Sequence, residues 1–274
     1  MNIETSLERA GYETIRGWLE QRCAIHYPEH KRDLLQQRLS RVQRAFHLAA
    51  LSQLAAEVTT ANNHEVQMAV IHAASTNHTY FFRETDVLEH FRSNVLPVLK
   101  NRREIRLWSA ACSTGDEVYT LAILIAETLG MEALARTQIL GTDISGPVIE
   151  RAEAGIFPAR HLEQTPDHIR SRYLRPVGIE QFQVTPEIRA ACTFRRMNLK
   201  SYPYPFRKPF QAVFCRNVLY YFAMKDQIDV IEAIADVTEP DGILFTSVTE
   251  TMRDMSPRWT YVTSGINRRT GAGA

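Results

Sequence analysis

The segment from Leu107 to Tyr119 constrains the fold of this chain more than any other. It begins as a short apolar run, passes through small residues and continues as an amphipathic pattern. That order predicts a strand, a tight turn and a helix, an arrangement that holds a ligand at the carboxyl end of a parallel strand. Downstream, Gln138 to Asp143 is a second strand-like run that ends in a carboxylate, where a βαβ unit places an acid to bind a ribose. Two such units predict a ligand-binding α/β sheet.

The alternation of strands and helices continues through most of the second half of the chain. We expect strands at Ile105–Trp108, Ile139–Gly141, Cys192–Met197, Ala212–Cys215 and Ile243–Thr246, and helices at Asp116–Leu129, Pro147–Glu153 and Lys225–Val237. Strands separated by helices predict a parallel, doubly wound sheet with ligands at the strand C-termini. The pattern fails between Gly155 and Val184, which is rich in proline and glycine, and only Gln181–Val184 alternates like a strand. This segment is predicted to be an insertion.

The region from Leu7 to Ala74 reads as helical, because apolar residues recur at helical spacing and no β-rich run interrupts them. Its clearest amphipathic stretch is Lys31 to Phe46. There Arg38, Arg41 and Arg44 advance three residues at a time along one flank of the expected helix. Such a basic stripe could meet an acidic helix of a partner. The alternative is a solvated face with ordinary local ion pairs.

Composition excludes several classes of function. The 274 residues carry a formal net charge of +1, which gives no global attraction to nucleic acid or membrane. The N-terminus has no apolar signal core, and no run approaches the roughly 18 apolar residues of a membrane span. The four cysteines are scattered without metal-ligand spacing, so neither a disulfide framework nor a metal site is expected. We expect a cytoplasmic protein that binds no nucleic acid and does not insert into membranes.

The turn after the first strand narrows the cofactor. It lacks the glycine pattern of a dinucleotide site, and Asp116 and Glu117 follow it directly. Two carboxylates at a helix start would repel a pyrophosphate but would suit a phosphate-free cofactor with cationic groups, such as S-adenosylmethionine. The alternative is that both acids only favour the first helical turn through its dipole, by ~0.3–1 kcal/mol each. These residues alone leave both interpretations open.

Longer motifs carry a family resemblance. Together, in order and over nearly the whole chain, five segments resemble the chemotaxis receptor methyltransferases, the CheR-like family: Thr76–Glu84, Trp108–Glu117, Gly141–Asp143, Asn198–Leu199 and Phe214–Phe222. The resemblance implies an α/β fold in which a Rossmann-like methyltransferase domain that binds S-adenosylmethionine carries a small antiparallel β-subdomain. The implied organisation is an all-helical domain over residues 1–74, a linker over 75–90 and the methyltransferase domain over 91–274, with the β-subdomain at about 170–192.

The resemblance also implies site residues. Those that would bind the cofactor are Asn77, Thr79, Arg83, Glu117, Asp143, Asn198, Leu199, Asn217 and Val218. Arg83 and Tyr221 match positions near the transferred methyl group, and we expect them to be catalytic. For Asp143 the alternative is a cap before Ser145; for Arg83 it is an ion pair between domains or a contact with the cofactor carboxylate; for Tyr221 it is a core aromatic beside Tyr220 and Phe222. The basic flank of Arg38, Arg41 and Arg44 gains an interpretation as a docking surface for receptor helices.

The expected reaction is transfer of methyl to glutamate side chains on the cytoplasmic helices of chemoreceptors, with S-adenosylhomocysteine as the product. Methyltransferases of amide or base nitrogens usually carry an Asp/Asn-Pro-Pro-aromatic turn where this chain has Arg216–Tyr220, so an oxygen acceptor fits better. The loop Arg175–Gln181 looks short beside relatives that bind a C-terminal receptor pentapeptide, so we expect no dependence on that tether, and a monomer. The residues Ser247–Glu250 stand where the family often has Gly-His-Ser-Glu. The alternatives are a methyltransferase of a sensor outside chemotaxis and a non-catalytic receptor-binding scaffold.

Overall fold

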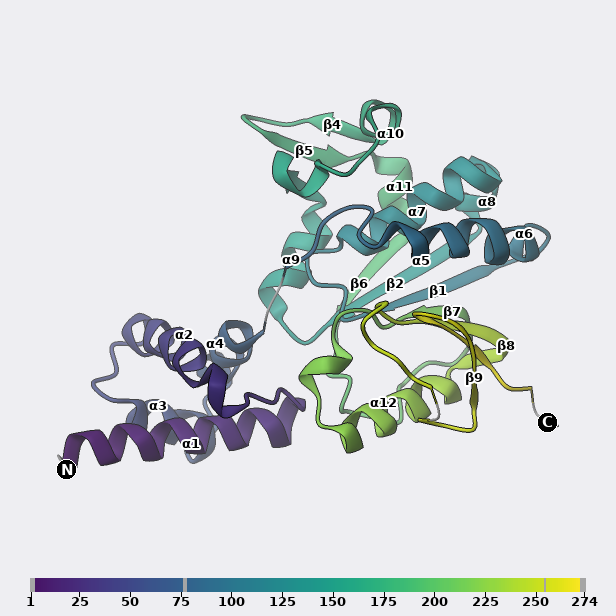
Figure 1. Cartoon of the computed structure of the whole chain (residues 1–274). Coiled ribbons are helices and arrows are strands. Elements are labelled where there is room, and N and C mark those ends of the chain that lie inside the picture. The colour runs from purple at the N-terminus through teal and green to yellow at the C-terminus, as the bar shows by residue number, and fades with distance from the viewer. Residues whose placement is uncertain (1–2, 76–77, 254, 272–274) are drawn as a thin grey trace.

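The computed structural model describes residues 3–75, 78–253 and 255–271. A helical domain lies at one end of the molecule, and an α/β domain capped by a small separate sheet forms the rest (Figure 1). Within the described residues, every helix is too short or too polar to cross a lipid bilayer.

Four helices form the N-terminal domain: α1 (Ile3–Cys23), α2 (Arg32–Ala45), α3 (Leu51–Thr59) and α4 (His64–Ala74), with a 3-10 turn η1 (Glu29–Lys31) before α2. The predicted apolar face of α2 is buried through Leu35, Leu39 and Val42. It packs in one core with Ile15 and Leu19 of α1. The helical reading of this region is confirmed.

The α/β domain is built on a seven-stranded sheet of order β6-β2-β1-β7-β8-β10-β9. Its strands are β1 (Ile105–Ala110), β2 (Thr137–Asp143), β6 (Cys192–Arg196), β7 (Phe210–Phe214), β8 (Thr238–Phe245), β9 (Trp259–Thr263) and β10 (Ile266–Arg269). The five predicted strands pair in parallel, as expected. The antiparallel pair β9 and β10 at one edge was not predicted. Four of the five residues of β9 are exposed, so this strand leaves no apolar run in the sequence.

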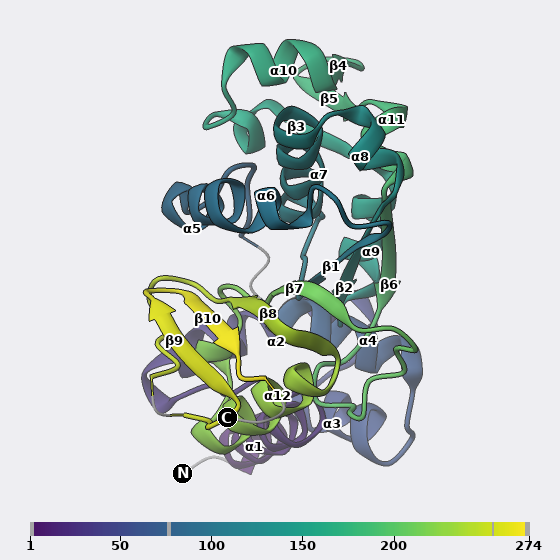
Figure 2. The same cartoon turned by 90° about the vertical axis from the view of Figure 1, so that its right-hand side faces the viewer.

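Helices cover both faces of this sheet (Figures 1 and 2). One face carries α5 (Thr85–His90), the π-helical turn η2 (Phe91–Val95), α6 (Leu96–Leu99) and α7 (Asp116–Leu129). The other face is covered by α12 (Met224–Asp236). In the chain, α8 (Met131–Ala135) precedes β2 and α9 (Gly146–Ala154) follows it. Successive residues of β1 serve the two cores, since Leu107 packs with α7 and Trp108 with α12. Gly141 lets α7 approach β2, because a Cβ there would lie 2.7 Å from Phe194 and 2.9 Å from Val118.

A second, three-stranded sheet of order β3-β5-β4 forms the small subdomain, and its pairs are antiparallel as the resemblance implied. It consists of β3 (Ile156–Pro158), β4 (Leu174–Pro176) and β5 (Gln181–Val184), with η3 (Ala159–Leu162), α10 (Asp167–Tyr173) and α11 (Pro186–Ala190). The predicted strand Gln181–Val184 is confirmed. β3 lies before the expected range of 170–192, since a three-residue strand that ends in proline leaves no periodic signal.

The helical domain is joined to the α/β domain by specific contacts. The backbone amide of His26 donates to the carbonyl of Tyr221 at 2.8 Å. The Asn198 side-chain amide donates to the Arg22 carbonyl at the end of α1 at 2.7 Å. From α4, the His72 ring nitrogen lies 2.7 Å from the Ser145 hydroxyl. These contacts attach the helical domain at the carboxyl ends of the parallel strands.

Candidate active site

The turn between β1 and α7 is held in an unusual backbone conformation. Ala111 and Ser113 have φ values of 64° and 50°, and Gly115 has 88°. Non-glycine residues in the left-handed region cost free energy and persist where the surrounding structure imposes them, often at functional sites. The amide of Cys112 donates to the carbonyl of Thr142 on β2 at 2.8 Å, which fixes the turn between two strand ends. The turn therefore presents its backbone to the space above β1.

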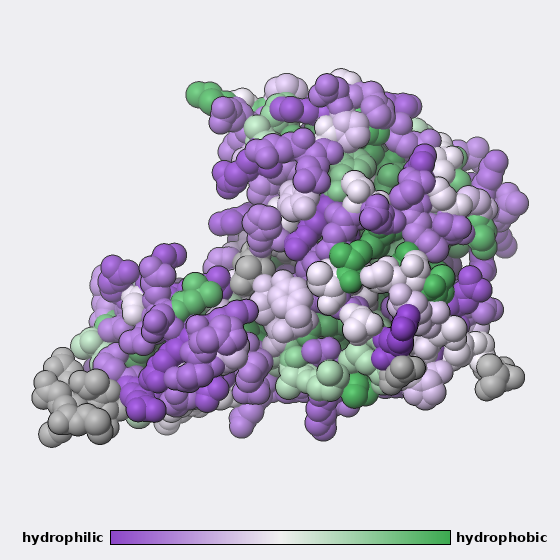
Figure 3. Space-filling view, in the orientation of Figure 1, coloured by the Kyte–Doolittle hydropathy of each residue, from purple (hydrophilic) through white to green (hydrophobic). Residues whose placement is uncertain are grey.

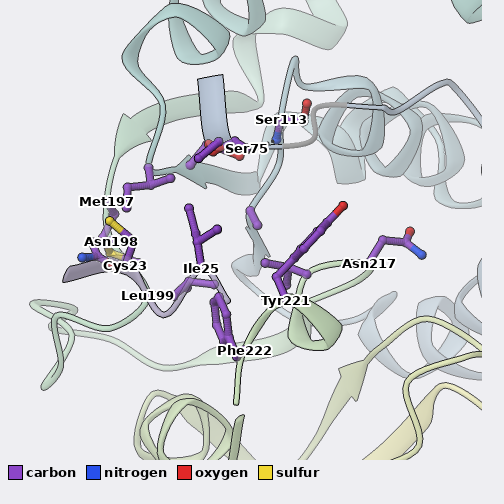
Figure 4. A pocket seen from close by; sticks show the side chains of 15 residues that line it. Cys23, Ile25, Ser75, Ser113, Met197, Asn198, Leu199, Asn217, Tyr221 and Phe222 are labelled. Atoms are coloured by element: carbon purple, nitrogen blue, oxygen red, sulfur yellow. Dashed lines mark hydrogen bonds between the residues drawn. The ribbon is translucent and has the colours of Figure 1, made fainter. Parts of the chain in front are cut away.

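Two pockets lie on either side of this turn, and Ala111, Ser113 and Asn217 line both. The first spans about 680 Å³, part of which is open to solvent. The helical domain and linker contribute Cys23, Ile25, Ala74 and Ser75, and the α/β domain contributes Asp143, Ile144, Met197, Asn198, Leu199, Val218, Tyr221 and Phe222. Figure 4 shows these side chains converging from both domains. Apolar side chains dominate this pocket, and Asp143 supplies its carboxylate.

The second pocket spans about 520 Å³, part of which is open to solvent, and its lining is more polar. Its lining includes His78, Thr79, Tyr80 and Arg83 of the linker and Glu117, Thr120 and Arg216 of the α/β domain. The predicted cofactor residues are thus divided between the two pockets: Asp143, Asn198, Leu199 and Val218 line the first, Thr79, Arg83 and Glu117 the second, and Asn217 both. Asn77 lies outside the described residues.

Asp143 is fixed at the carboxyl end of β2. One carboxylate oxygen accepts the amide of Ser113 at 3.0 Å, and the other accepts the amide of Ser145 at 2.9 Å. Burial raises the pKa of Asp143, although both hydrogen bonds act in the opposite direction. A carboxylate oxygen has more than one lone pair, so the group retains capacity for ligand hydroxyls. Asp143 both organises the loop before α9 and lines the first pocket, and its binding of a ribose stays a prediction.

The two acids at the start of α7 point in different directions. Glu117 lines the second pocket, where its Oε1 accepts the Ser109 hydroxyl at 2.7 Å. Asp116 is wholly buried; it accepts the Thr114 hydroxyl at 2.5 Å and pairs with the His161 ring at 2.6 Å. The expectation that both acids face a cationic ligand is therefore wrong for Asp116, because consecutive helical residues project about 100° apart.

Arg83 extends along the second pocket. Its Nη1 donates to the His78 carbonyl at 2.8 Å, and its guanidinium carbon lies 5.9 Å from the centre of the Tyr80 ring. Among the contacts of the described residues, Arg83 makes no ion pair, which disfavours an ion-pair role between domains. Its charge is available to an anionic group in the pocket.

The loop after β7 supplies the remaining residues. Tyr221 lines the first pocket, and its oxygen accepts a hydrogen bond from the Tyr220 hydroxyl at 3.0 Å. Tyr220 is 50% exposed, so Tyr221 is the tyrosine that enters the site, reaching toward the turn that carries Ser113 (Figure 4). Asn217, with φ of 57°, donates its side-chain amide to Glu84 at 2.9 Å.

The altered Ser247–Glu250 segment supports this loop. The Glu250 carboxylate accepts the amides of Asn217 at 2.9 Å and Ser247 at 3.0 Å, and burial raises the pKa of Glu250. The Ser247 hydroxyl donates to Glu84 at 2.8 Å. The substitution of the family's residues around Glu250 thus leaves a connected hydrogen-bond network.

Sequence reasoning missed several pocket residues. Ile25, which follows α1, and Ala74, the last residue of α4, come from the helical domain, and no local sequence pattern shows that these segments face the strand ends of the other domain. Ala111 and Ser113 lie in the turn that the sequence predicted to hold a ligand, and they line both pockets, but their left-handed backbone conformation was not predicted. Arg216 lies inside a motif that the sequence singled out, so its charge beside the expected site was the one available signal.

The three arginines on α2 differ in their burial and contacts. Arg38 is half-buried, and its Nη1 donates to the Tyr27 hydroxyl at 2.9 Å and to the Ala74 carbonyl at 3.1 Å. Arg41 and Arg44 are exposed. The expected docking flank of three equivalent arginines is therefore reduced to two, because Arg38 is turned toward the start of the linker.

Comparison with known proteins shows the family to which this chain belongs. Residues 10–71 match the family "CheR methyltransferase, all-alpha domain", and residues 77–267 match "CheR methyltransferase, SAM binding domain". The chemotaxis protein methyltransferase of Salmonella typhimurium is 33% identical over 258 residues, which cover 93% of this chain and 88% of the relative. The corresponding protein of Escherichia coli is 32% identical over 95% of this chain and 91% of its own length. Chemotaxis protein methyltransferase 1 of Pseudomonas aeruginosa is 32% identical over 94% and 96%.

The matched families account for both domains, and S-adenosylmethionine is the cofactor of the larger one. The second pocket, where Glu117 and Arg83 carry opposite charges, suits a phosphate-free ligand group that carries both an ammonium and a carboxylate. The chain belongs to the CheR methyltransferase family and is an S-adenosylmethionine-dependent methyltransferase.

Proposed function

We propose that this enzyme transfers methyl from S-adenosylmethionine to glutamate side chains of chemoreceptors, forming methyl esters in chemosensory adaptation. It acts in the cytoplasm as a monomer, without nucleic acid and without inserting into the membrane. The observation that carries the proposal is the pair of unlike pockets that meet at Ala111, Ser113 and Asn217. One is apolar with a single carboxylate, and the other is polar with charges of both signs.

Because the first pocket is apolar and the second is polar, we assign them to different parts of the cofactor. Asp143 accepts the ribose hydroxyls, and Asn198, Leu199 and Val218 line the side of the first pocket that takes the adenine. In the second pocket Glu117 accepts the ammonium group, and Thr79 lies beside the amino-acid end. Arg83 binds the cofactor carboxylate in preference to the acceptor, since a clamp on the acceptor would stabilise the nucleophile before reaction. Asn77 and Asn217 complete the predicted set.

Methyl transfer requires the protein mainly to orient the two reactants. S-adenosylmethionine supplies a methyl group on a sulfonium, which becomes a neutral thioether as S-adenosylhomocysteine is formed. A glutamate side chain with an ordinary pKa of about 4.3 is already an anion at neutral pH, so no general base is needed. Holding the reactants in line and excluding water can supply roughly 7–11 kcal/mol of the barrier in favourable cases.

Tyr221 is the residue that orients the acceptor. Because its oxygen accepts the hydroxyl hydrogen of Tyr220, its own hydroxyl hydrogen can be donated to another group. Tyr221 lines the pocket that shares Asn217 and Ser113 with the second one, so its hydroxyl serves the region where the two meet. Donation to one carboxylate oxygen of the acceptor leaves the other oxygen as the nucleophile.

A third cavity provides the route for the acceptor. It shares His78, Thr79 and Tyr80 with the second pocket and extends to Arg160, His161, Glu163 and Gln164 of the small subdomain, enclosing about 1060 Å³ with its open mouth. Figure 3 shows the hollow between the helical domain and the subdomain as a mainly hydrophilic surface. The helix α2, which carries Arg41 and Arg44, lies on the side of the helical domain that faces this hollow (Figure 1). A receptor helix rich in glutamate would meet Arg41 and Arg44 on the side of the helical domain, and Arg160 beside Glu163 on the side of the subdomain.

Recognition of a receptor pentapeptide is not part of the proposal. The strands β3 and β4 form the two edges of the small sheet, and each has three residues, ending in Pro158 and Pro176. Short edges with proline offer few hydrogen bonds to an added strand. Calorimetric titration with the pentapeptide should show no binding, and micromolar affinity would contradict this part of the proposal.

The test of function is transfer of radiolabelled methyl to cytoplasmic fragments of the native receptors. The proposal expects label that alkali releases as methanol, and loss of labelling in Tyr221→Phe with S-adenosylhomocysteine affinity retained. Tyr220→Phe is the matched control and should lose less activity, because Tyr220 is outside the pocket. Absence of base-labile label on all native receptors would refute receptor methylation and favour another sensor protein or a non-catalytic scaffold.

A further inference from the structure

Arg216 is a deeply buried cation in the wall of the second pocket, with 3% of its side chain exposed. Its Nη1 lies 2.7 Å from Glu117 Oε2. Its Nη2 donates to the Arg83 carbonyl at 2.5 Å and lies 3.4 Å from Glu84 Oε2. One planar guanidinium therefore contacts both the helix start that carries Glu117 and the linker that carries Arg83.

We propose that Arg216 is a positioning residue that fixes Glu117 relative to Arg83, and so determines recognition of the amino-acid end of the cofactor. The inference rests on the proposed roles of Glu117 and Arg83. Arg216 acts through these two neighbours rather than on the reacting atoms. Its consequence is that the helix α7 and the linker form one rigid binding surface, although 32 residues of sequence lie between Arg83 and Asp116.

The linker side of this arrangement is itself held in place. Glu84, with φ of 57°, accepts Asn217 at 2.9 Å and the Ser247 hydroxyl at 2.8 Å. Burial acts to raise the pKa of Glu84, but the hydrogen bond from Asn217 and the charge of Arg216 outweigh it, and the pKa lies below its ordinary value. Glu84 is thus an anion held in place by hydrogen bonds, and Arg216 lies beside it.

The geometry requires arginine rather than a positive charge alone. A guanidinium presents several N–H donors in a rigid plane, whereas a lysine ammonium is a compact charge on a flexible stem. Lysine at position 216 could approach Glu117 or Glu84, but it could not hold both acids and the Arg83 carbonyl in a fixed relation. Arg216→Lys should therefore keep a positive charge near Glu117 and Glu84 but no longer fix Glu117 relative to Arg83.

The experiment compares two ligands and three variants by calorimetry on the full chain. The ligands are S-adenosylhomocysteine and its analogue in which hydrogen replaces the α-amino group. Arg216→Met should weaken S-adenosylhomocysteine binding by about 10-fold or more, the scale of one hydrogen bond to a charged group, and change analogue binding by less than about threefold. Arg216→Lys should show an intermediate loss with the same selectivity.

Arg258→Met is the matched control. Arg258 also pairs with two acids of this domain, Asp236 at 2.7 Å and Glu232 at 3.5 Å, and it lines neither pocket. This variant should leave both affinities unchanged. If Arg216→Met does not fold, Arg216→Lys carries the comparison alone.

The outcomes distinguish a failure of the proposed role of Arg216 from a failure of the proposed cofactor site. Equal weakening of both ligands in the Arg216 variants would show a general structural role, and unchanged binding of S-adenosylhomocysteine would show none; either result overturns the inference. A wild-type protein that binds neither ligand, or both equally, would instead refute the proposed cofactor site.

Discussion

Replacement of Arg38 by methionine should destabilise the protein and weaken cofactor binding together. The Arg38 Nη1 donates to the Tyr27 hydroxyl at 2.9 Å and to the carbonyls of Ala73, Ala74 and Ser75 at 3.3, 3.1 and 3.3 Å. Ala74 and Ser75 also line the first pocket. The side chain therefore secures the segment where α4 ends and the linker to the cofactor site begins.

The expected magnitude follows from these contacts. A hydrogen bond to a charged group is worth about 1.5–3 kcal/mol when one partner is removed. The acceptors share a single nitrogen, and the Ala74 carbonyl keeps its 2.6 Å hydrogen bond from Tyr27. The loss should therefore fall in the lower part of the range, about 2 kcal/mol. For a protein larger than about 150 residues, 1 kcal/mol shifts Tm by about 2–4 °C, which gives a fall of about 4–8 °C.

Thermal denaturation followed by circular dichroism, with a parallel titration of S-adenosylhomocysteine, measures both effects. Arg41→Met is the matched control, because Arg41 lies three residues further along α2 and is exposed. It should leave Tm and cofactor affinity unchanged. The reasoning fails if Arg38→Met and Arg41→Met melt together within about 1 °C, or if Arg38→Met binds S-adenosylhomocysteine as the wild type does.

Three further outcomes are expected. Asp143→Ala should weaken S-adenosylhomocysteine binding by about 10- to 150-fold, from the loss of roughly 1.5–3 kcal/mol of charged hydrogen bonding; a calorimetric loss below threefold would argue against ribose binding. Arg41→Glu should lower the rate of receptor methylation with cofactor affinity unchanged, and equal rates in the radiolabel assay would exclude a docking role. Burial, aided by the charge of Arg151, lowers the pKa of His72 from its ordinary 6.5, so the unfolded chain binds the proton more readily. Stability should therefore be full above pH 6.5 and fall as the pH drops through the folded pKa, and urea melts of His72→Gln should show a smaller fall.

The central elements were predictable because local pattern and burial agree in them. The helix α7 spans Asp116–Leu129 as its apolar spacing indicated, and Gly130 ends it with φ of 88°. Of the five parallel strands, β1, β2, β7 and β8 leave apolar runs in the sequence because most of their residues are buried, whereas β6 buries only Phe194. By contrast, β9 contributes Trp259 to the core and exposes the rest, while β3 and β4 have three residues each, so pairing with neighbours defines these strands more than composition does.

The site residues were predictable from motifs and the environment of each was not. Sequence periodicity grouped Arg38, Arg41 and Arg44 because they share one flank of a helix. It did not show that Arg38 would reach the carbonyls of α4, since that contact depends on how two helices pack. For the same reason the motif placed Arg216 near the site without revealing the two acids from distant segments that surround it.

The acids at the start of α7 show how a partly wrong prediction still located a functional element. Of the two acids only Glu117 lines a pocket, so the case against a phosphate-bearing cofactor depends on one carboxylate there and on Asp143 across the turn. Asp116 acts one step further away: it holds the ring of His161, whose carbonyl accepts the amide of Phe81 at 3.0 Å. That hydrogen bond secures the linker beside the wall formed by residues 78–80 and Arg83. Asp116, for which the sequence left open a contact with a cationic ligand, instead anchors the segment that lines the second pocket, and it joins the small subdomain to the same wall.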